Sequence, residues 1–196
     1  MQKLTVDDIA DLRAYERERD AFRAHVIDLK ARRRIALGDL LTITFENTDT
    51  MRFQVQEMAR AERMLTDAAI AHEVTTYNEL IPDPGELSGT LFIELTSDAL
   101  LREWLPKFVG IEFHIFFELG ARGSGIQVRA VPRDEERLTR DDITTTVHYL
   151  RFPFSAEQRA QFVDGPVRLA VDHPEYQVWV ELNDAQHAEL AADFAD

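Results

Sequence analysis

Apolar residues near the N-terminus recur at every third or fourth position, which is the spacing of one buried helix face. The pattern predicts a long first helix over residues 5–33, opened by a capping-box pair of Thr5 and Asp8. Its apolar stripe consists of Ile9, Leu12, Tyr15, Phe22, Val26 and Leu29. Dense mixed charge lies between these positions, as expected for a solvated face. A helix of this length either lies across a sheet or stays partly exposed for a partner.

A second, central helix is predicted over residues 49–71, with Asp49 or Thr50 as its cap. Its apolar residues are Val55, Met58, Ala59, Leu65, Ala68 and Ala69. Glu62 keeps the three-and-four spacing of this stripe, so we expect its carboxylate to face the core. Glu73 lies about three turns further on and would share this face if the helix extends that far.

Further along the chain, short segments alternate apolar and polar residues, as strands do. These segments are residues 40–47, 90–95, 110–120, 125–132, 144–154, 167–174 and 176–183. Hairpin turns join several of them and helices are predicted between others, so we predict an α+β fold around a largely antiparallel sheet. The pattern leaves open whether this sheet stays open or curls toward a barrel.

The length of 196 residues suits a single domain over residues 1–196 with a sizeable core. We divide this domain into an N-terminal helix over residues 1–34, a sheet with inserted helices over residues 35–183, and a C-terminal helix over residues 184–196. The apolar fraction of 45% is ordinary for a globular protein and supports this prediction.

The composition argues against several classes of function. The chain has no cysteine, which excludes disulfides, thiolate zinc sites, iron–sulfur clusters held by the protein and thiol catalysis. The net charge of −14 argues against a general role in binding nucleic acid or a membrane surface, because binding a polyanion requires clustered positive charge. A basic run at the end of the first predicted helix complements the helix C-terminus. It consists of Lys30, Arg32, Arg33 and Arg34.

The sequence also carries no sign of membrane insertion or export. No apolar run approaches the ~20 residues that a membrane-spanning helix requires. The N-terminal segment MQKLTVDDIADL is polar and acidic and does not resemble a signal peptide. We therefore expect a cytoplasmic protein, and the sequence leaves its oligomeric state open.

Polar residues gather on and just after the second predicted helix. The candidate ligand-binding cluster consists of Glu57, Arg60, Glu62, Tyr77 and Asn78. A carboxylate that faces a core must be paired, hydrogen-bonded, protonated or metal-bound, because its desolvation is otherwise too costly. The cluster is therefore either an ion-pair network that ties the helix to its neighbours or a site for a small ligand.

A metal site is the sharper form of the second interpretation. Imidazole and carboxylate together are the ligands of iron, manganese and zinc sites that lack thiolates. The candidate ligands are Glu62, His72, Glu73, His114 and His148. No HExxH or ExxH motif supports this set, and a lone strand histidine is more often a hydrogen-bonded core residue than a ligand. The pattern identifies no cofactor.

Three segments resemble the signature blocks of a bacterial family catalogued as domain of unknown function 3501. They are FENTDTMRFQVQEMARAER, HEVTTYNELIPDPGELSGTLFIEL and VHYLRFPF, and the resemblance begins with KLTVDDIADLRAYERERDAFR and covers nearly the whole chain. The family has no established activity. Its members are often encoded beside rubrerythrin-like proteins and iron–sulfur oxidoreductases, so the resemblance implies a partner in peroxide or redox defence.

Two functions therefore follow from the sequence. The first is an accessory or interaction protein for a redox system, with a rubrerythrin-like or iron–sulfur oxidoreductase as its partner. The alternative is an enzyme that depends on a metal or a small ligand and uses the Glu62, Glu73 and histidine cluster. A purely structural ion-pair core around Glu62, with no site at all, also fits the pattern.

Overall fold

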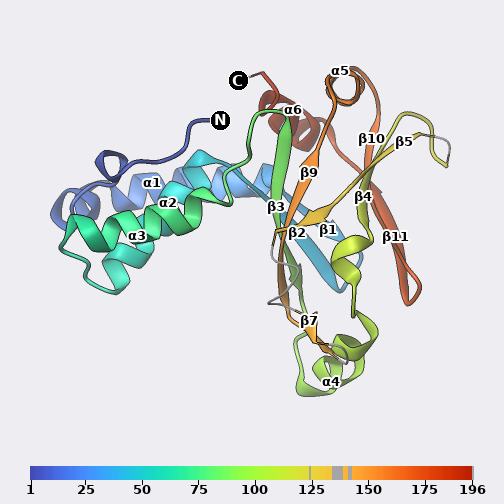
Figure 1. Ribbon diagram of the computed structural model, residues 1–196, viewed down its shortest axis with the longest axis horizontal. Coiled ribbons are helices and arrows are strands. Elements are labelled where there is room, and N and C mark those ends of the chain that lie inside the picture. Colours follow the sequence, from blue (N-terminus) through green and yellow to red (C-terminus); the bar gives the residue numbers. More distant parts are fainter. Residues whose placement is uncertain (124, 134–138, 141–142, 196) are drawn as a thin grey trace.

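The computed structural model describes residues 1–123, 125–133, 139–140 and 143–195, and it shows three layers (Figure 1). A helical layer lies on one side, and two antiparallel sheets follow it across the molecule. The first sheet has the order β1-β2-β3-β9-β6, and the second has the order β11-β10-β4-β5. Within these ranges every strand pair is antiparallel and neither sheet closes into a barrel, so the prediction of an α+β fold is confirmed.

The strands are short, and the chain contributes to both sheets in turn. The first sheet consists of β1 (Arg34–Leu37), β2 (Leu41–Glu46), β3 (Glu86–Ile93), β6 (Val131–Pro132) and β9 (Val147–Pro153). The second consists of β4 (Ile115–Leu119), β5 (Ile126–Arg129), β10 (Val167–His173) and β11 (Tyr176–Glu181). A small ladder pairs β7 (Thr139–Arg140) with β8 (Ile143–Thr144).

The helices fall into two groups. The first group is the helical arm, which projects beyond the edge of the first sheet (Figure 1). It consists of η1 (Val6–Asp8), α1 (Leu12–Arg33), α2 (Thr48–Ala61) and α3 (Asp67–Asn78). The others flank the sheets and are α4 (Asp98–Lys107), η2 (Ile111–Phe113), α5 (Ala156–Asp164) and α6 (Asp184–Ala192). Within the described ranges, no helix combines the length and the apolar character that crossing a membrane requires.

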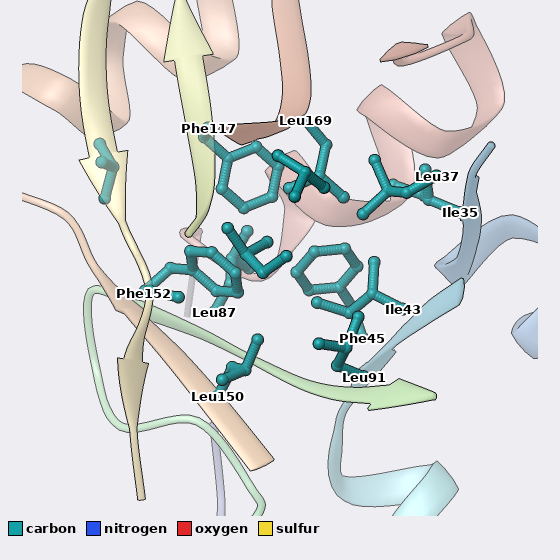
Figure 2. Packing of buried hydrophobic residues seen from close by; sticks show 14 of the residues in the cluster. Ile35, Leu37, Ile43, Phe45, Leu87, Leu91, Phe117, Leu150, Phe152 and Leu169 are labelled. Atoms are coloured by element: carbon teal, nitrogen blue, oxygen red, sulfur yellow. The ribbon is translucent and has the colours of Figure 1, made fainter. Parts of the chain in front are cut away.

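One apolar core fills the space between the two sheets (Figure 2). Phe45, Phe117 and Phe152 meet there with ring centroids 5.0 to 5.9 Å apart. Gly89 leaves the room that β2 needs, since a Cβ at this position would lie 2.8 Å from the Cδ1 atom of Ile43. The arm has its own small cluster, formed by Leu4, Met51, Val55, Val74 and Ile81.

The central helix predicted over residues 49–71 is two helices, so this prediction was wrong. Glu62 is the C-cap of α2, and Arg63 adopts a left-handed conformation with φ of 52°. The Met64 N–H donates to the Ala59 carbonyl at 2.9 Å, which is the closing bond of a Schellman motif. The cap of α2 is Asn47 rather than the predicted Asp49 or Thr50.

Other boundaries also differ from the prediction, and β3, for example, begins at Glu86 rather than at residue 90. The Thr5–Asp8 capping box opens η1, and Asp11 caps α1 because Ile9 is extended between them. The chain passes straight from α1 into β1, a strand that the sequence analysis missed. The predicted strand over residues 110–120 begins only at Ile115, after a turn of 3₁₀-helix.

Candidate functional site

Glu57, the first residue of the predicted ligand-binding cluster, joins α1 to α2. Its carboxylate accepts a hydrogen bond of 2.6 Å from the Tyr15 hydroxyl and bonds of 2.8 and 2.9 Å from the Arg19 guanidinium. The hydrogen bonds from Arg19 hold the pKa of Glu57 below its ordinary value, while burial raises the pKa of Tyr15. The carboxylate thus stays charged, and these contacts fit the structural interpretation of this residue.

Arg60 and Glu62 lie on the surface of the arm. The Nε atom of Arg60 donates to Glu16 at 2.6 Å, which is a second link between the helices. Glu62 is exposed at the end of α2, so the prediction that it faces the core was wrong. The helix continues only as far as Ala61. Because the chain leaves the helix there, Glu62 and the residues after it no longer continue the apolar face of α2.

Asn78 and Tyr77 occupy the end of α3. The Asn78 amide accepts from the Leu4 N–H and donates to the Leu4 carbonyl, both at 2.8 Å, and so holds the N-terminal segment against the arm. Tyr77 is half-buried and packs against the apolar cluster of the arm. Of the predicted cluster, Tyr77 is the one residue that also lines the cavity described below.

The predicted metal ligands are not brought together. His72 is exposed and Glu73 half-buried on α3, while His148 is buried with its Nδ1 atom 3.8 Å from Glu112. His114 lies beside Asp172, with 3.0 Å between its Nδ1 atom and the carboxylate. In the part of the chain that the structure describes, no group of three or more histidine, aspartate or glutamate side chains is placed to hold a metal ion.

A cavity of about 260 Å³ lies where the arm meets the first sheet, and we refer to it as the junction cavity. Helix side chains form one wall, among them Lys30 from α1, Gln54 from α2 and Tyr77 from α3. Sheet side chains form the other wall, namely Glu46, Thr90, Phe92, Val147 and Tyr149. The helical layer and the first sheet are therefore both needed to form the cavity.

Strand alternation explains which sheet residues reach the junction cavity. Ile43 and Phe45 of β2 are fully buried in the core between the sheets, so Glu46 points to the opposite face. Thr90 pairs with Tyr149 across β3 and β9, and both share this face. The base of the helical arm packs over part of this face at the junction cavity, where Glu46 and Thr90 are buried and Tyr149 is half-buried.

Glu46 is the buried carboxylate of the junction cavity, with 5% of its surface exposed. One carboxylate oxygen accepts a hydrogen bond from the Thr50 hydroxyl and the other from the Thr90 hydroxyl, both at 2.7 Å. Among the described residues, no cationic side chain pairs with Glu46. A carboxylate oxygen can accept more than one hydrogen bond, so Glu46 keeps acceptor capacity toward the cavity.

Arg33 is a buried cation that contacts the backbone of Glu46 rather than its carboxylate. The Arg33 guanidinium donates to the backbone carbonyls of Phe45 at 2.8 Å and Glu46 at 3.2 Å. Its charge pairs with Glu189 of α6 and with Asp193, the C-cap of that helix. Arg33 therefore binds the backbone at the end of β2, and its charge pairs with carboxylates other than that of Glu46.

A family model described as "Protein of unknown function (DUF3501)" matches residues 3–194. The chain belongs to this family. A crystal structure of a protein of unknown function from Burkholderia pseudomallei K96243 is similar to this DUF3501 chain, with a TM-score of 0.88 and 32% identity over 98% of this chain and 99% of that one. No curated protein matches the chain.

The sequence pattern of this DUF3501 protein singled out one lining residue of the junction cavity as a site candidate and missed the others. Tyr77 was named as a candidate, whereas Glu46, Thr90 and Tyr149 were assigned only to strands. Lys30 was interpreted as part of the basic run that complements a helix end. The available signal was Glu46 itself, an acidic residue on the outward positions of an alternating strand, but nothing in the pattern shows that helices cover that face.

Proposed function

We propose that this DUF3501 protein binds a small polar organic molecule in the junction cavity. The observation that carries this proposal is the buried Glu46 carboxylate, which lines a cavity and has two hydroxyl groups as its only side-chain partners among the residues that the structure describes. An uncompensated buried charge costs free energy. Donors from a ligand would offset this cost and so make binding favourable.

The lining of the junction cavity fits this role better than the clusters predicted from sequence. Small-molecule sites are mostly apolar and contain a few polar groups that fix the orientation of the ligand. Phe92 and Val147 supply apolar surface, and Glu46, Lys30 and Gln54 supply polar groups. In contrast, Glu57 and Asn78 already bond to other parts of the protein.

Filling the junction cavity tests the proposal. Val147→Phe places a larger side chain on its wall, and Val163→Phe makes the same change on an exposed position of α5. We expect compounds from a metabolite library to raise the melting temperature of the wild type and of Val163→Phe but not of Val147→Phe. An unchanged response of Val147→Phe, with its own fold intact by circular dichroism, would refute binding in this cavity.

The second candidate function is the accessory role in a cytoplasmic redox or peroxide-defence system. The observation that favours it is the tip of the helical arm, where Leu65 is 82% exposed. A groove of about 360 Å³ lies beside it, lined by Val6, Ile9, Leu12 and Ile70 together with acidic residues. Leu65 lines the same groove as these half-buried apolar residues, and contiguous exposed apolar surface can mark a protein-binding site.

This candidate is tested with purified partners rather than with extracts. A rubrerythrin-like protein and an iron–sulfur oxidoreductase are titrated against the wild type and Leu65→Asp, with Val163→Asp as the control on α5. We expect one of the two to bind, and Leu65→Asp to weaken the complex at least tenfold. Equal affinity of all three proteins, or no complex with either partner, would rule out this docking surface.

A further inference from the structure

We propose that the ligand of the junction cavity is a small zwitterion, such as an α-amino acid with an apolar or aromatic side chain. This inference rests on the proposed function, since it assigns a chemical class to the molecule bound there. It is drawn from the two opposite charges that the cavity presents.

The two charges come from different layers of the molecule. Glu46 belongs to the sheet wall and Lys30 to the helix wall. They form no ion pair with each other, so more than 4.0 Å separates the carboxylate from the ammonium group. Within the described ranges, Lys30 has no other hydrogen-bond or ion-pair partner, and Glu46 has only its two hydroxyls.

A ligand with a single charge would satisfy only half of this arrangement. An amine would pair with Glu46 and leave Lys30 unmatched, and an acid would do the reverse. A zwitterion matches both, because its ammonium group donates to Glu46 while its carboxylate accepts from Lys30. Charge-assisted hydrogen bonds of this kind are stronger than those between neutral groups.

Two hydrogen bonds orient the Glu46 carboxylate, so it can accept hydrogen bonds from an ammonium group without rearranging. Thr50 and Thr90 each fix one of its oxygens from the side of the protein. The Gln54 side chain also lines the cavity and supplies an amide oxygen as a further acceptor. An ammonium group has three donors, so the carboxylate and this amide can bind it together.

The size and the apolar lining of the junction cavity limit the rest of the ligand. Its volume of about 260 Å³ lies below the roughly 300–1,000 Å³ of sites for drug-sized molecules. Met51, Leu80 and Phe92 offer apolar surface for a side chain. A molecule of the size of leucine or phenylalanine therefore suits the cavity better than a nucleotide or a sugar phosphate.

Two matched sets of compounds test the charge requirement by titration calorimetry. The first set is phenylalanine, 2-phenylethylamine and 3-phenylpropionate. The second is leucine, 3-methylbutylamine and 4-methylpentanoate. In each set the last two compounds lack either the carboxylate or the ammonium group. We expect at least one amino acid to bind no less than tenfold more tightly than both of its analogues.

Two variants assign each charge to its partner. Glu46→Gln should bind the amino acid only as tightly as the wild type binds the acid analogue. Lys30→Met should bind the amino acid only as tightly as the wild type binds the amine analogue. Binding of an analogue as tightly as its amino acid, or no binding of either amino acid, would overturn the inference. If other library compounds bind to the wild type but not to Val147→Phe, only the assignment of a zwitterion is refuted. If no library compound binds in this way, the proposed function is refuted as well.

Discussion

Arg33 ends α1 inside the protein, with 1% of its surface exposed. Its guanidinium donates to two backbone carbonyls at the end of β2 and pairs with Glu189 of α6 and with the C-cap Asp193. One side chain therefore joins the arm, the first sheet and the C-terminal helix. A buried cation of this kind is tolerable only because its donors are matched by acceptors.

Replacing Arg33 tests this role. We expect Arg33→Met to lower the free energy of unfolding by about 3–5 kcal/mol, because it leaves buried carbonyls and carboxylates without their donor. Arg32→Met is the matched control on the neighbouring position, where the side chain is partly exposed and pairs with Asp28 and Glu189. Urea denaturation should show a much smaller loss for Arg32→Met, and an equal loss for both would contradict this account.

His148 makes stability depend on pH. Burial lowers the pKa of its imidazole, against the opposing effect of the nearby Glu112 carboxylate. The ring is buried with the Thr144 hydroxyl 3.0 Å from its Nε2 atom. A depressed pKa means that the unfolded chain takes up the proton first. The stability contribution of neutral His148 is therefore complete above about pH 6.5, the ordinary histidine value, and is lost as the pH falls through the folded pKa.

The measurement is the free energy of unfolding between about pH 7.5 and pH 5. We expect the wild type to lose stability over this range and His148→Gln, which cannot titrate, to lose less. Parallel curves for the two proteins would show that this imidazole does not carry the pH dependence.

At the scale of elements, the break between α2 and α3 sets the shape of the arm. Arg63 occupies the left-handed position of the Schellman motif, where glycine is the usual residue. Substitutions at this position distinguish the observed break from the continuous helix that the apolar spacing predicts. In a left-handed turn glycine is favoured over alanine, whereas in a continuous helix alanine is favoured over glycine.

We expect Arg63→Gly to be more stable than Arg63→Ala by about 1 kcal/mol, because the glycine avoids the steric cost of the left-handed conformation. Thermal or urea denaturation of the two variants gives the sign of the difference. A higher stability of the alanine variant would mean that the helix continues through this position.

The sequence was informative for elements and much less so for their ends. Alternation located most of the longer strands, although it missed β1, because one face of each packs in the core, as Phe45, Phe117 and Phe152 do (Figure 2). The break at Arg63 was missed because no glycine marks it. Glu46 was missed because its burial depends on how the helices of the arm pack against the outward face of the sheet, which local spacing does not encode.

At the scale of the whole molecule, the arm and the first sheet together line the junction cavity, which is separate from the apolar core between the two sheets. The core between the sheets explains the stability of the fold. The junction cavity has a different character, since it combines a buried carboxylate with an ammonium group and aromatic walls. A ligand bound there would contact both layers and would hold the arm against the sheet.

The same arrangement connects the two candidate functions. The arm carries the exposed Leu65 at its tip and the ligand-lining residues Lys30, Gln54 and Tyr77 near its base. A ligand in the junction cavity would therefore act on the element that is proposed to dock a redox partner. Binding of the partner and of the small molecule would then affect each other by the same factor, as thermodynamic linkage requires.

The most direct test of the central claim, that the junction cavity is a ligand site, is an NMR titration of this 22.5 kDa protein. A compound that raises the melting temperature is added while backbone amide shifts are followed. We predict that the largest changes occur at Glu46, Thr90 and Tyr77, on both walls of the cavity, and that Val147→Phe abolishes them. Changes confined to the arm tip or to the second sheet, with none at Glu46, would contradict the account.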